Sequence, residues 1–205
     1  MSEKAMTITY PVKNGIYVNM TNRCNCACTF CIRFQNSGVY GSDPLWLEHE
    51  PTVEETIASL KTWNLAEKDE IVFCGYGEPT KRLEDLLEVA AWIKANTSLP
   101  VRLNTNGLAC LEYGKDVTPL LAGKIDCVSI SLNADTKEKY LAVTRPEFGE
   151  AAWEAMKTFA HECTKHVPDV VMTVVDQVTT PEEQKNAAEL CRELGVRLRV
   201  REYVG

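Results

Sequence analysis

The chain has 205 residues, 45% of them hydrophobic, which is enough for one sizeable core in a single domain spanning residues 1–205. Its net charge of −7 excludes a general electrostatic attraction to nucleic-acid backbones. Residues 1–10 lack the apolar stretch of a signal peptide, and no run approaches the roughly 20 apolar residues of a membrane helix. Nine cysteines therefore indicate a thiol-rich protein of the reducing cytoplasm.

Six short runs rich in apolar and β-branched residues predict six strands. They cover residues 16–20, 70–74, 101–105, 127–132, 170–175 and 196–203. Helical patterns lie between these runs, over about residues 52–60, 83–90, 117–121, 135–145, 153–163 and 180–195. Strand and helix in alternation predict parallel strands with right-handed crossovers. The expected fold is α/β, a partial (βα)6 TIM-type barrel, in which ligands bind at the C-terminal ends of the strands.

Three cysteines that follow the first predicted strand carry the clearest chemical signal. Cys24, Cys28 and Cys31 have the spacing C-x3-C-x2-C, and three thiolates this close can hold one metal centre. A 4Fe–4S cluster normally takes four cysteine ligands, so three leave one iron open to an outside ligand. Cys26 is expected to remain a thiol outside the metal centre. A zinc site is the alternative, but the remaining cysteines form no second C-x2-C pair.

The cluster loop, residues 22–34, resembles that of the radical S-adenosylmethionine (SAM) enzymes. In that family SAM chelates the open iron, and an electron from the cluster cleaves SAM to a 5′-deoxyadenosyl radical that abstracts hydrogen from a substrate. The resemblance implies a 4Fe–4S cluster held by Cys24, Cys28 and Cys31, with SAM as second cofactor. It also places Phe30, the aromatic residue before the third cysteine, near the adenine.

Further motifs of the same family follow the next strands. The stretch Gly75-Tyr76-Gly77-Glu78-Pro79 resembles the family's G-G-E-P motif, whose backbone meets the SAM amino group, and Gly77 permits close backbone approach. Asn104, Thr105 and Asn106 close the third strand and suit the methionine end of SAM.

Ser131 and Asn133 close the fourth strand and resemble the family's ribose motif. Arg145 is either a ligand of the SAM carboxylate or a surface arginine at a helix end. The polar residues at these strand ends are also ordinary turn-formers. The family's G-x-I-x-G-x-x-E pattern is absent near Val174, which leaves the adenine contacts beyond Phe30 unassigned.

Three segments, residues 22–24, 46–52 and 73–79, resemble those of the short radical SAM proteins called TatD-associated. This similarity implies a functional link to a TatD-type metal hydrolase and does not name a reaction. An enzyme of this kind also needs an external electron donor.

The segment 32–51 is long for a loop in a compact domain and is a candidate lid for the substrate. It carries Tyr40, Trp46, Glu48 and His49 directly after the cluster motif. We expect it to govern substrate coupling and not SAM binding, with Glu48 and His49 as candidate catalytic residues. The alternative for His49 is a solvated surface group.

The last predicted strand alternates apolar residues with Arg197, Arg199 and Arg201, which places the three arginines on one face. If that face is the barrel interior, Arg201 lies nearest the active end and is a candidate catalytic residue that receives an anionic group of the substrate. The alternative is an edge strand protected by solvated arginines.

The whole pattern predicts a radical SAM enzyme of unknown substrate. One alternative is an activase that generates a protein radical. Another is a non-catalytic iron–sulfur carrier or zinc module, although such a protein has no use for the polar strand ends around Gly77, Asn106 and Asn133.

Overall fold

A computed structural model describes residues 5–34, 39 and 41–203, which form two compact units. Unit 1 takes the described residues within Met1–Cys24, Ile32–Asn104 and Lys124–Asp126, and unit 2 those within Asn25–Cys31, Thr105–Gly123 and Cys127–Gly205. The predicted lid segment includes Tyr40 and residues 35–38, which lie outside the described residues. Among the described residues, no helix is both long enough and apolar enough to cross a lipid bilayer.

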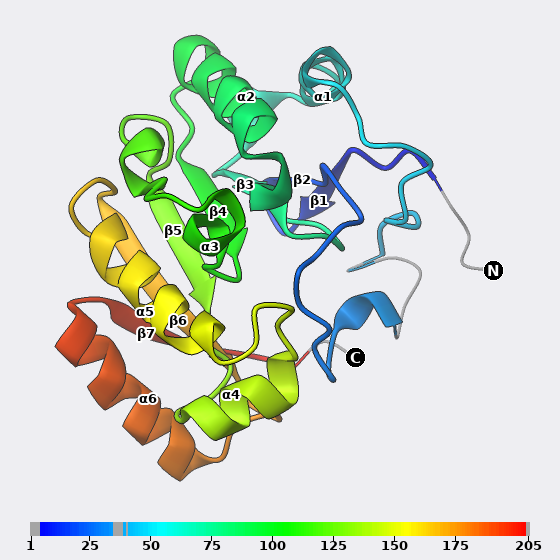
Figure 1. Cartoon of the computed structure of the whole chain (residues 1–205). Helices are drawn as coiled ribbons and strands as arrows, with labels where there is room; N and C mark the ends of the chain where they lie inside the picture. Colours follow the sequence, from blue (N-terminus) through cyan, green and yellow to red (C-terminus); the bar gives the residue numbers. More distant parts are fainter. Residues whose placement is uncertain (1–4, 35–38, 40, 204–205) are drawn as a thin grey trace. The chain divides into compact units, whose positions relative to one another are not determined.

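Unit 1 contains four neighbouring strands in chain order (Figure 1). They are β1 (Thr9–Val12), β2 (Gly15–Val18), β3 (Ile71–Phe73) and β4 (Val101–Thr105). β1 is antiparallel to β2, whereas β2, β3 and β4 run parallel, so the chain leaves these three strands at one edge of the sheet. The register places Ile16, Ile71 and Val101 on one face. All three side chains are fully buried.

The helices of unit 1 begin where the sequence provides caps. α1 (Val53–Leu60) starts at Thr52, whose side chain accepts from Glu55 N while the Glu55 carboxylate accepts from Thr52 N. α2 (Leu83–Asn96) packs against α1 and against the 3-10 turn η3 (Pro79–Arg82). Two further 3-10 turns, η1 (Ile32–Phe34) and η2 (Leu65–Glu67), complete the unit.

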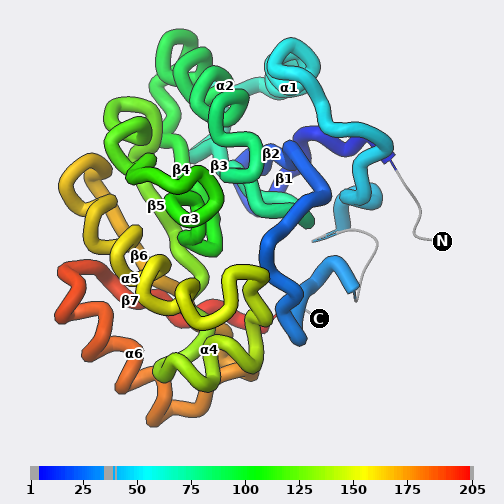
Figure 2. The backbone as a smooth tube through the Cα atoms, viewed as in Figure 1, coloured from blue at the N-terminus to red at the C-terminus, as the bar shows by residue number. Residues whose placement is uncertain are grey.

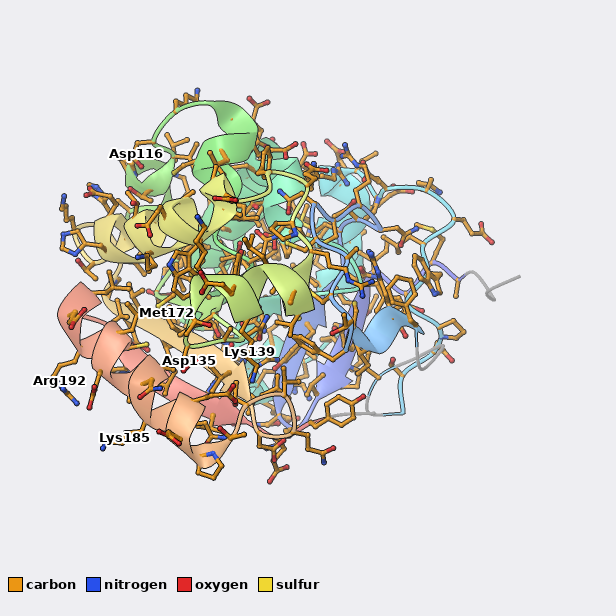
Figure 3. All side chains as sticks on the ribbon, turned by 60° about the horizontal axis from the view of Figure 1, so that its bottom comes forward. Asp116, Asp135, Lys139, Met172, Lys185 and Arg192 are labelled. Atoms are coloured by element: carbon orange, nitrogen blue, oxygen red, sulfur yellow. The ribbon has the colours of Figure 1, made fainter. Side chains whose placement is uncertain are left out.

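Unit 2 contains three parallel strands, β5 (Cys127–Ser131), β6 (Asp169–Val175) and β7 (Arg197–Arg201). Its helices are α3 (Ala109–Tyr113), the 3-10 turn η4 (Thr118–Leu121), α4 (Lys137–Thr144), α5 (Ala151–Cys163) and α6 (Pro181–Leu194). α5 packs on β5 and β6, and α6 packs on β6 and β7. Met172 of β6 is buried, whereas Lys185 and Arg192 lie on the exposed side of α6 (Figure 3).

The structure confirms the predicted α/β fold with parallel strands. Each of the six predicted strands corresponds to one of the strands β2 to β7. Strand β1 was not predicted, because Pro11 in its centre argues against a strand in sequence. The proline is tolerated because β1 pairs only with β2 within unit 1. The predicted helix at residues 117–121 is the short 3-10 turn η4, and α3 was missed.

Candidate active site

Within unit 2, residues 25–31 of the cluster loop lie against the end of α4 (Figure 2). Ala27 N donates to the carbonyls of Thr144 at 3.0 Å and Arg145 at 3.3 Å, and Thr29 N donates to Val143 O at 2.9 Å. α4 ends at Arg145, which adopts a left-handed conformation with φ of 47°. The last carbonyls of a helix have no partner within it, so here they hold the cluster loop in place.

All nine cysteines lie in the described part of the chain and are thiols outside any disulfide. Cys24, Cys28 and Cys31 are partly exposed, whereas Cys26 is only 6% exposed. Asn106 Nδ2 lies 3.6 Å from the Cys26 sulfur. Three accessible thiols with a buried fourth fit the predicted register, in which Cys26 is not a ligand. Among the described residues no three metal-ligating side chains already form a compact site, so this assignment rests on spacing and accessibility.

The turn at residues 75–79, the SAM turn, packs within unit 1 on residues 19–23, the approach segment that leads to Cys24. A Cβ on Gly75 would lie 2.0 Å from Asn19 Oδ1. A Cβ on Gly77 would lie 2.3 Å from Thr21 O and 2.6 Å from Arg23 O. Both positions require glycine because the approach segment passes so close. The immediate neighbour of Gly77 is thus the approach segment, and the contact of this turn with SAM stays a prediction.

The side chains of Tyr76 and Glu78 in the SAM turn make contacts within unit 1. The Glu78 carboxylate is buried and accepts from Thr80 N at 3.1 Å and from Thr80 Oγ1 at 2.8 Å. The Tyr76 ring is buried and meets the Trp46 ring edge-on, with 5.3 Å between centroids. Trp46 belongs to the predicted lid segment, so this segment supports the SAM turn. The expectation that the lid segment governs substrate coupling and not SAM binding stays a prediction.

The residues that close β4 have different surroundings. Asn104 Oδ1 is buried with no hydrogen-bond partner among the described residues. Thr105 Oγ1 accepts from Gly107 N at 3.1 Å. Asn106 Nδ2 donates to Asn25 Oδ1 at 2.5 Å, and Asn106 Oδ1 accepts from Leu108 N at 3.0 Å. Asn104 therefore has an acceptor to offer a ligand, whereas Asn106 supports the cluster loop.

Asn25 is a site residue that the sequence reasoning missed. Besides its contact with Asn106, its Nδ2 donates to Glu112 Oε2 at 3.4 Å, and its carbonyl accepts from Glu147 N at 2.9 Å. The side chain is almost fully buried. Its position within the cysteine motif was the only available signal, and the contacts with residues 81 or more positions away could not be read from the sequence.

Asn133 is the clearest candidate ligand contact in unit 2. Its backbone has a positive φ of 60°, which is uncommon for a residue other than glycine, and it is 3% exposed. Its Oδ1 is buried with no hydrogen-bond partner among the described residues. A buried unsatisfied acceptor costs free energy unless a donor reaches it. A ribose hydroxyl is such a donor, so this position fits the predicted contact with SAM; Ser131, two residues earlier, is half-buried.

The remaining predicted SAM contacts lie in unit 2. Phe30 is half-buried in the cluster loop, as a platform for an adenine requires. The Arg145 side chain is exposed beyond the end of α4. The assignment of Arg145 to the SAM carboxylate stays a prediction.

Glu48 and His49 are both exposed. His49 Nε2 lies 3.3 Å from Glu55 Oε1, in the cap that starts α1. The pKa of Glu55 is lowered, first by the hydrogen bond from Thr52 N and second by His49. His49 therefore lies beside the start of α1. The catalytic role of Glu48 and His49 stays a prediction.

The three arginines of β7 are not equivalent. Arg197 is exposed and forms a two-oxygen ion pair with Asp169, at 2.8 Å and 2.6 Å from Nη2, which lowers the pKa of Asp169. Arg199 Nη2 donates to Ser129 Oγ at 3.3 Å. Arg201 is half-buried, and its Nε is buried with no hydrogen-bond partner among the described residues. Only Arg197 therefore behaves as a solvated arginine of an edge strand.

The pattern of the radical SAM superfamily matches residues 18–205. GTP 3′,8-cyclase from Corynebacterium glutamicum (strain R) is 29% identical over 142 residues, which cover 65% of this chain and 34% of that enzyme. The chain thus spans about a third of the length of this curated relative.

Solved structures share the fold. Streptococcus suis SuiB matches 89% of this chain and 38% of its own, with a TM-score of 0.66 and 15% identity. SuiB bound to S-adenosylmethionine matches with a TM-score of 0.64, at 15% identity over 92% of this chain and 38% of its own. A radical SAM methyltransferase from Sphaerobacter thermophilus matches with a TM-score of 0.61, at 16% identity over 95% of this chain and 57% of its own.

These likenesses confirm the fold class, and neither the carrier nor the zinc module is favoured. The radical SAM enzyme class and its two cofactors, a 4Fe–4S cluster and SAM, agree with the donor set and the unsatisfied strand-end acceptors. From motif, fold and match together, this chain belongs to the radical SAM superfamily.

Proposed function

We propose that this chain cleaves SAM and uses the resulting radical to abstract hydrogen from a substrate that carries an anionic group. When bound, the cluster supplies the electron that cleaves SAM to the 5′-deoxyadenosyl radical. Cys24, Cys28 and Cys31 are the residues that would hold it. The chain's own contribution is position. In unit 2 the end of α4 fixes residues 25–31 of the cluster loop, and Asn133 has a buried acceptor suited to SAM. In unit 1 Asn104 has a buried acceptor of the same kind.

The anionic group is inferred from one face of the sheet in unit 2. The register of the three strands aligns Ser131, Thr173 and Arg199 in one row, with Arg201 two residues further along β7. This face carries polar side chains together with the buried Val171 and Val175, whereas the opposite face carries Val128, Ile130 and Met172, all fully buried. Arg201 thus lies at the end of β7 where substrates bind in parallel barrels.

The unsatisfied Arg201 Nε is the observation that carries this proposal. A guanidinium is always charged, and its burial is unfavourable unless a partner compensates the charge. A phosphate or carboxylate accepts two parallel hydrogen bonds from an arginine, so either group of a substrate would satisfy Arg201.

Inorganic phosphate is a suitable first probe of this site. Phosphate binding to the reconstituted enzyme, measured by calorimetry, should weaken in Arg201→Ala and persist in Arg197→Ala, because Arg197 already has Asp169 as its partner. Uncoupled cleavage of SAM should continue in both variants. Equal phosphate binding in wild type and Arg201→Ala would remove Arg201 from the substrate site and leave the SAM chemistry untouched.

We further propose that the chain is a member of the TatD-associated subgroup and acts in the cytoplasm. The three segments that carry the subgroup resemblance contact one another in unit 1: Asn22 with Leu47, Arg23 with Glu50, and Trp46 with Tyr76. Nine thiols without a disulfide suit a reducing compartment. The implied partners are an external electron donor and a TatD-type hydrolase. Incubation of the enzyme's product with such a hydrolase tests that link, and an unchanged product would speak against it.

A further inference from the structure

The approach segment, residues 19–23, connects β2 to the first cluster cysteine and is held from two sides. On one side it meets the SAM turn, where Glu78 N donates to Arg23 O at 2.8 Å and Gly77 leaves no room for a Cβ beside Thr21 and Arg23. The same few carbonyl groups therefore set the path to Cys24 and the position of the SAM turn.

On the other side lies a strap, residues 45–50, from the described part of the lid segment. Asn19 Nδ2 donates to Leu45 O at 2.8 Å. Asn22 contacts Leu47 twice, with Nδ2 donating to its carbonyl at 2.8 Å and Oδ1 accepting from its amide at 3.0 Å. Leu45 and Leu47 are both buried, so the strap is anchored in unit 1 by its apolar side chains.

Glu50 makes the most contacts at the end of this strap. Its carboxylate accepts from Thr21 Oγ1 and takes two hydrogen bonds from Arg23, Nε to Oε1 at 2.7 Å and Nη2 to Oε2 at 2.9 Å. Arg82 Nε lies 3.9 Å from Glu50 Oε2. Arg82 is only 11% exposed at its side chain and also donates to Met20 O at 3.2 Å.

A single exposed ion pair contributes little, and Arg23 is 58% exposed at its side chain. Glu50 differs from such a pair in two ways. Its contact with Arg23 is bidentate, which fixes direction as well as distance. It also joins Thr21 and Arg23, the two residues whose carbonyls face Gly77. Loss of the carboxylate would release both residues at once and leave the nearly buried Arg82 with less compensation.

We propose that Glu50 is a positioning residue for both cofactors, which it fixes through the approach segment so that Cys24 and the SAM turn keep one arrangement. It does not touch the cluster or SAM. It acts on Cys24 through Arg23, and on the SAM turn through Thr21 and Arg23. Outer groups that orient metal ligands typically change metal affinity or activity by roughly 10–100-fold when they are removed.

The test compares Glu50→Gln with wild type in the full chain after anaerobic reconstitution. We expect iron loss to a chelator to be faster and SAM affinity weaker, each by roughly 10–100-fold. The electron paramagnetic resonance spectrum of the reduced cluster with SAM should also change. Glu55→Gln is the matched control, because Glu55 is the nearby carboxylate of the α1 cap and makes none of these contacts.

Arg23→Lys provides a second, milder variant that keeps the charge and loses the bidentate geometry. We expect it to change iron loss and SAM affinity in the same direction, and the double variant with Glu50→Gln to be little worse than Glu50→Gln alone. Thermal unfolding of the apoprotein separates stability from positioning. Lower apoprotein stability with wild-type iron retention, SAM affinity and spectrum would make Glu50 purely structural and overturn the proposal.

Discussion

Asn133 combines an uncommon backbone conformation with a buried acceptor that has no partner among the described residues. Residues are held in such conformations only where the surrounding structure determines them, and they gather at ligand sites. The combination could not be read from the sequence, where Asn133 is one of several short polar residues at a strand end. The family resemblance selected it, and its backbone conformation and buried acceptor supply the physical reason.

We predict that Asn133→Ala and Asn133→Gly both weaken SAM binding by about 1–3 kcal/mol, because each removes the acceptor for a buried hydrogen bond. Glycine adopts φ of 60° without strain, whereas alanine does not. The apoprotein of Asn133→Gly should therefore be more stable than that of Asn133→Ala. Calorimetric SAM titration and thermal unfolding check the two effects separately. Wild-type affinity in Asn133→Gly would exclude the amide from SAM binding.

Gly77 has a role that the sequence reasoning described only in part. The motif predicts close approach of a ligand, but the nearest atoms are the carbonyls of Thr21 and Arg23. Contacts between segments more than 50 positions apart, such as this one, leave no local pattern in the sequence. Asn25 escaped the sequence reasoning for the same reason. The partners of Glu50 are nearer, about 30 positions away, but they too lie outside any local sequence pattern.

We predict that Gly77→Ala lowers iron content and SAM affinity together, because the added Cβ must displace the backbone that leads to Cys24. Gly123→Ala is the control: Gly123 has a positive φ of 70° but no atoms within 4 Å of an added Cβ. It should therefore cost only local strain, about 1–2 kcal/mol. Iron analysis and SAM titration measure the outcome, and full iron content in Gly77→Ala would contradict the predicted displacement.

The secondary-structure elements were predictable where their own residues carry the signal. Thr52 with Glu55 and Thr180 with Glu183 mark the starts of α1 and α6, and both capping boxes are present. Gly195 ends α6 in the left-handed conformation. By contrast, β1 exists because β2 lies beside it, and its central proline hides it in sequence. Local chemistry therefore gave the helix ends, and tertiary pairing decided the extra strand.

The start of α6 leads to a prediction about pH. The pKa of Glu183 lies below its ordinary value of 4.5, first because Lys139 donates to its carboxylate at 2.5 Å and second because Thr180 N does so. A carboxyl whose pKa is lowered on folding stabilises the fold above its unfolded pKa, and this contribution disappears as the pH falls through the lowered value.

We therefore expect Glu183→Gln to be less stable than wild type at neutral pH by about 1 kcal/mol, the usual size of a cap interaction. The difference should begin to shrink as the pH falls below 4.5, where the unfolded chain takes up the proton, and should be lost as the pH falls through the lowered pKa of folded Glu183. Urea unfolding at a series of pH values measures it. Glu154→Gln, in an exposed pair with Lys157, should show little effect at any pH. If the difference in unfolding free energy between wild type and Glu183→Gln did not depend on pH, the loss of stability would come from packing and not from the charge of Glu183.

At the scale of the whole chain, the alternation of strands and helices was sufficient to predict the fold class. Parallel strands send their following loops to one edge, so the cysteines, the SAM turn and the polar strand ends were expected at strand ends, and each follows its strand in the structure. The substrate could not be predicted in this way, because it depends on side chains such as Arg201 whose surroundings come from distant segments.

The cysteine motif determines whether the whole enzyme binds its cluster and cleaves SAM. Reconstituted wild type should hold about four irons and release 5′-deoxyadenosine from SAM under reducing conditions. Cys24→Ala, Cys28→Ala and Cys31→Ala should each abolish both, since each removes a ligand from a cluster that has only three. Cys26→Ala should retain both, because Cys26 is buried against Asn106 and contributes packing.

The expected cost of Cys26→Ala is a loss of stability, because the contact with Asn106 helps to hold Asn25 and thereby the cluster loop. Iron content, 5′-deoxyadenosine yield and thermal unfolding, measured on all four variants, separate these roles. If Cys26→Ala alone lost the cluster while Cys24→Ala kept it, the ligand register would have to move by two residues. The approach segment, and with it Glu50, would then lie further from the first ligand than proposed.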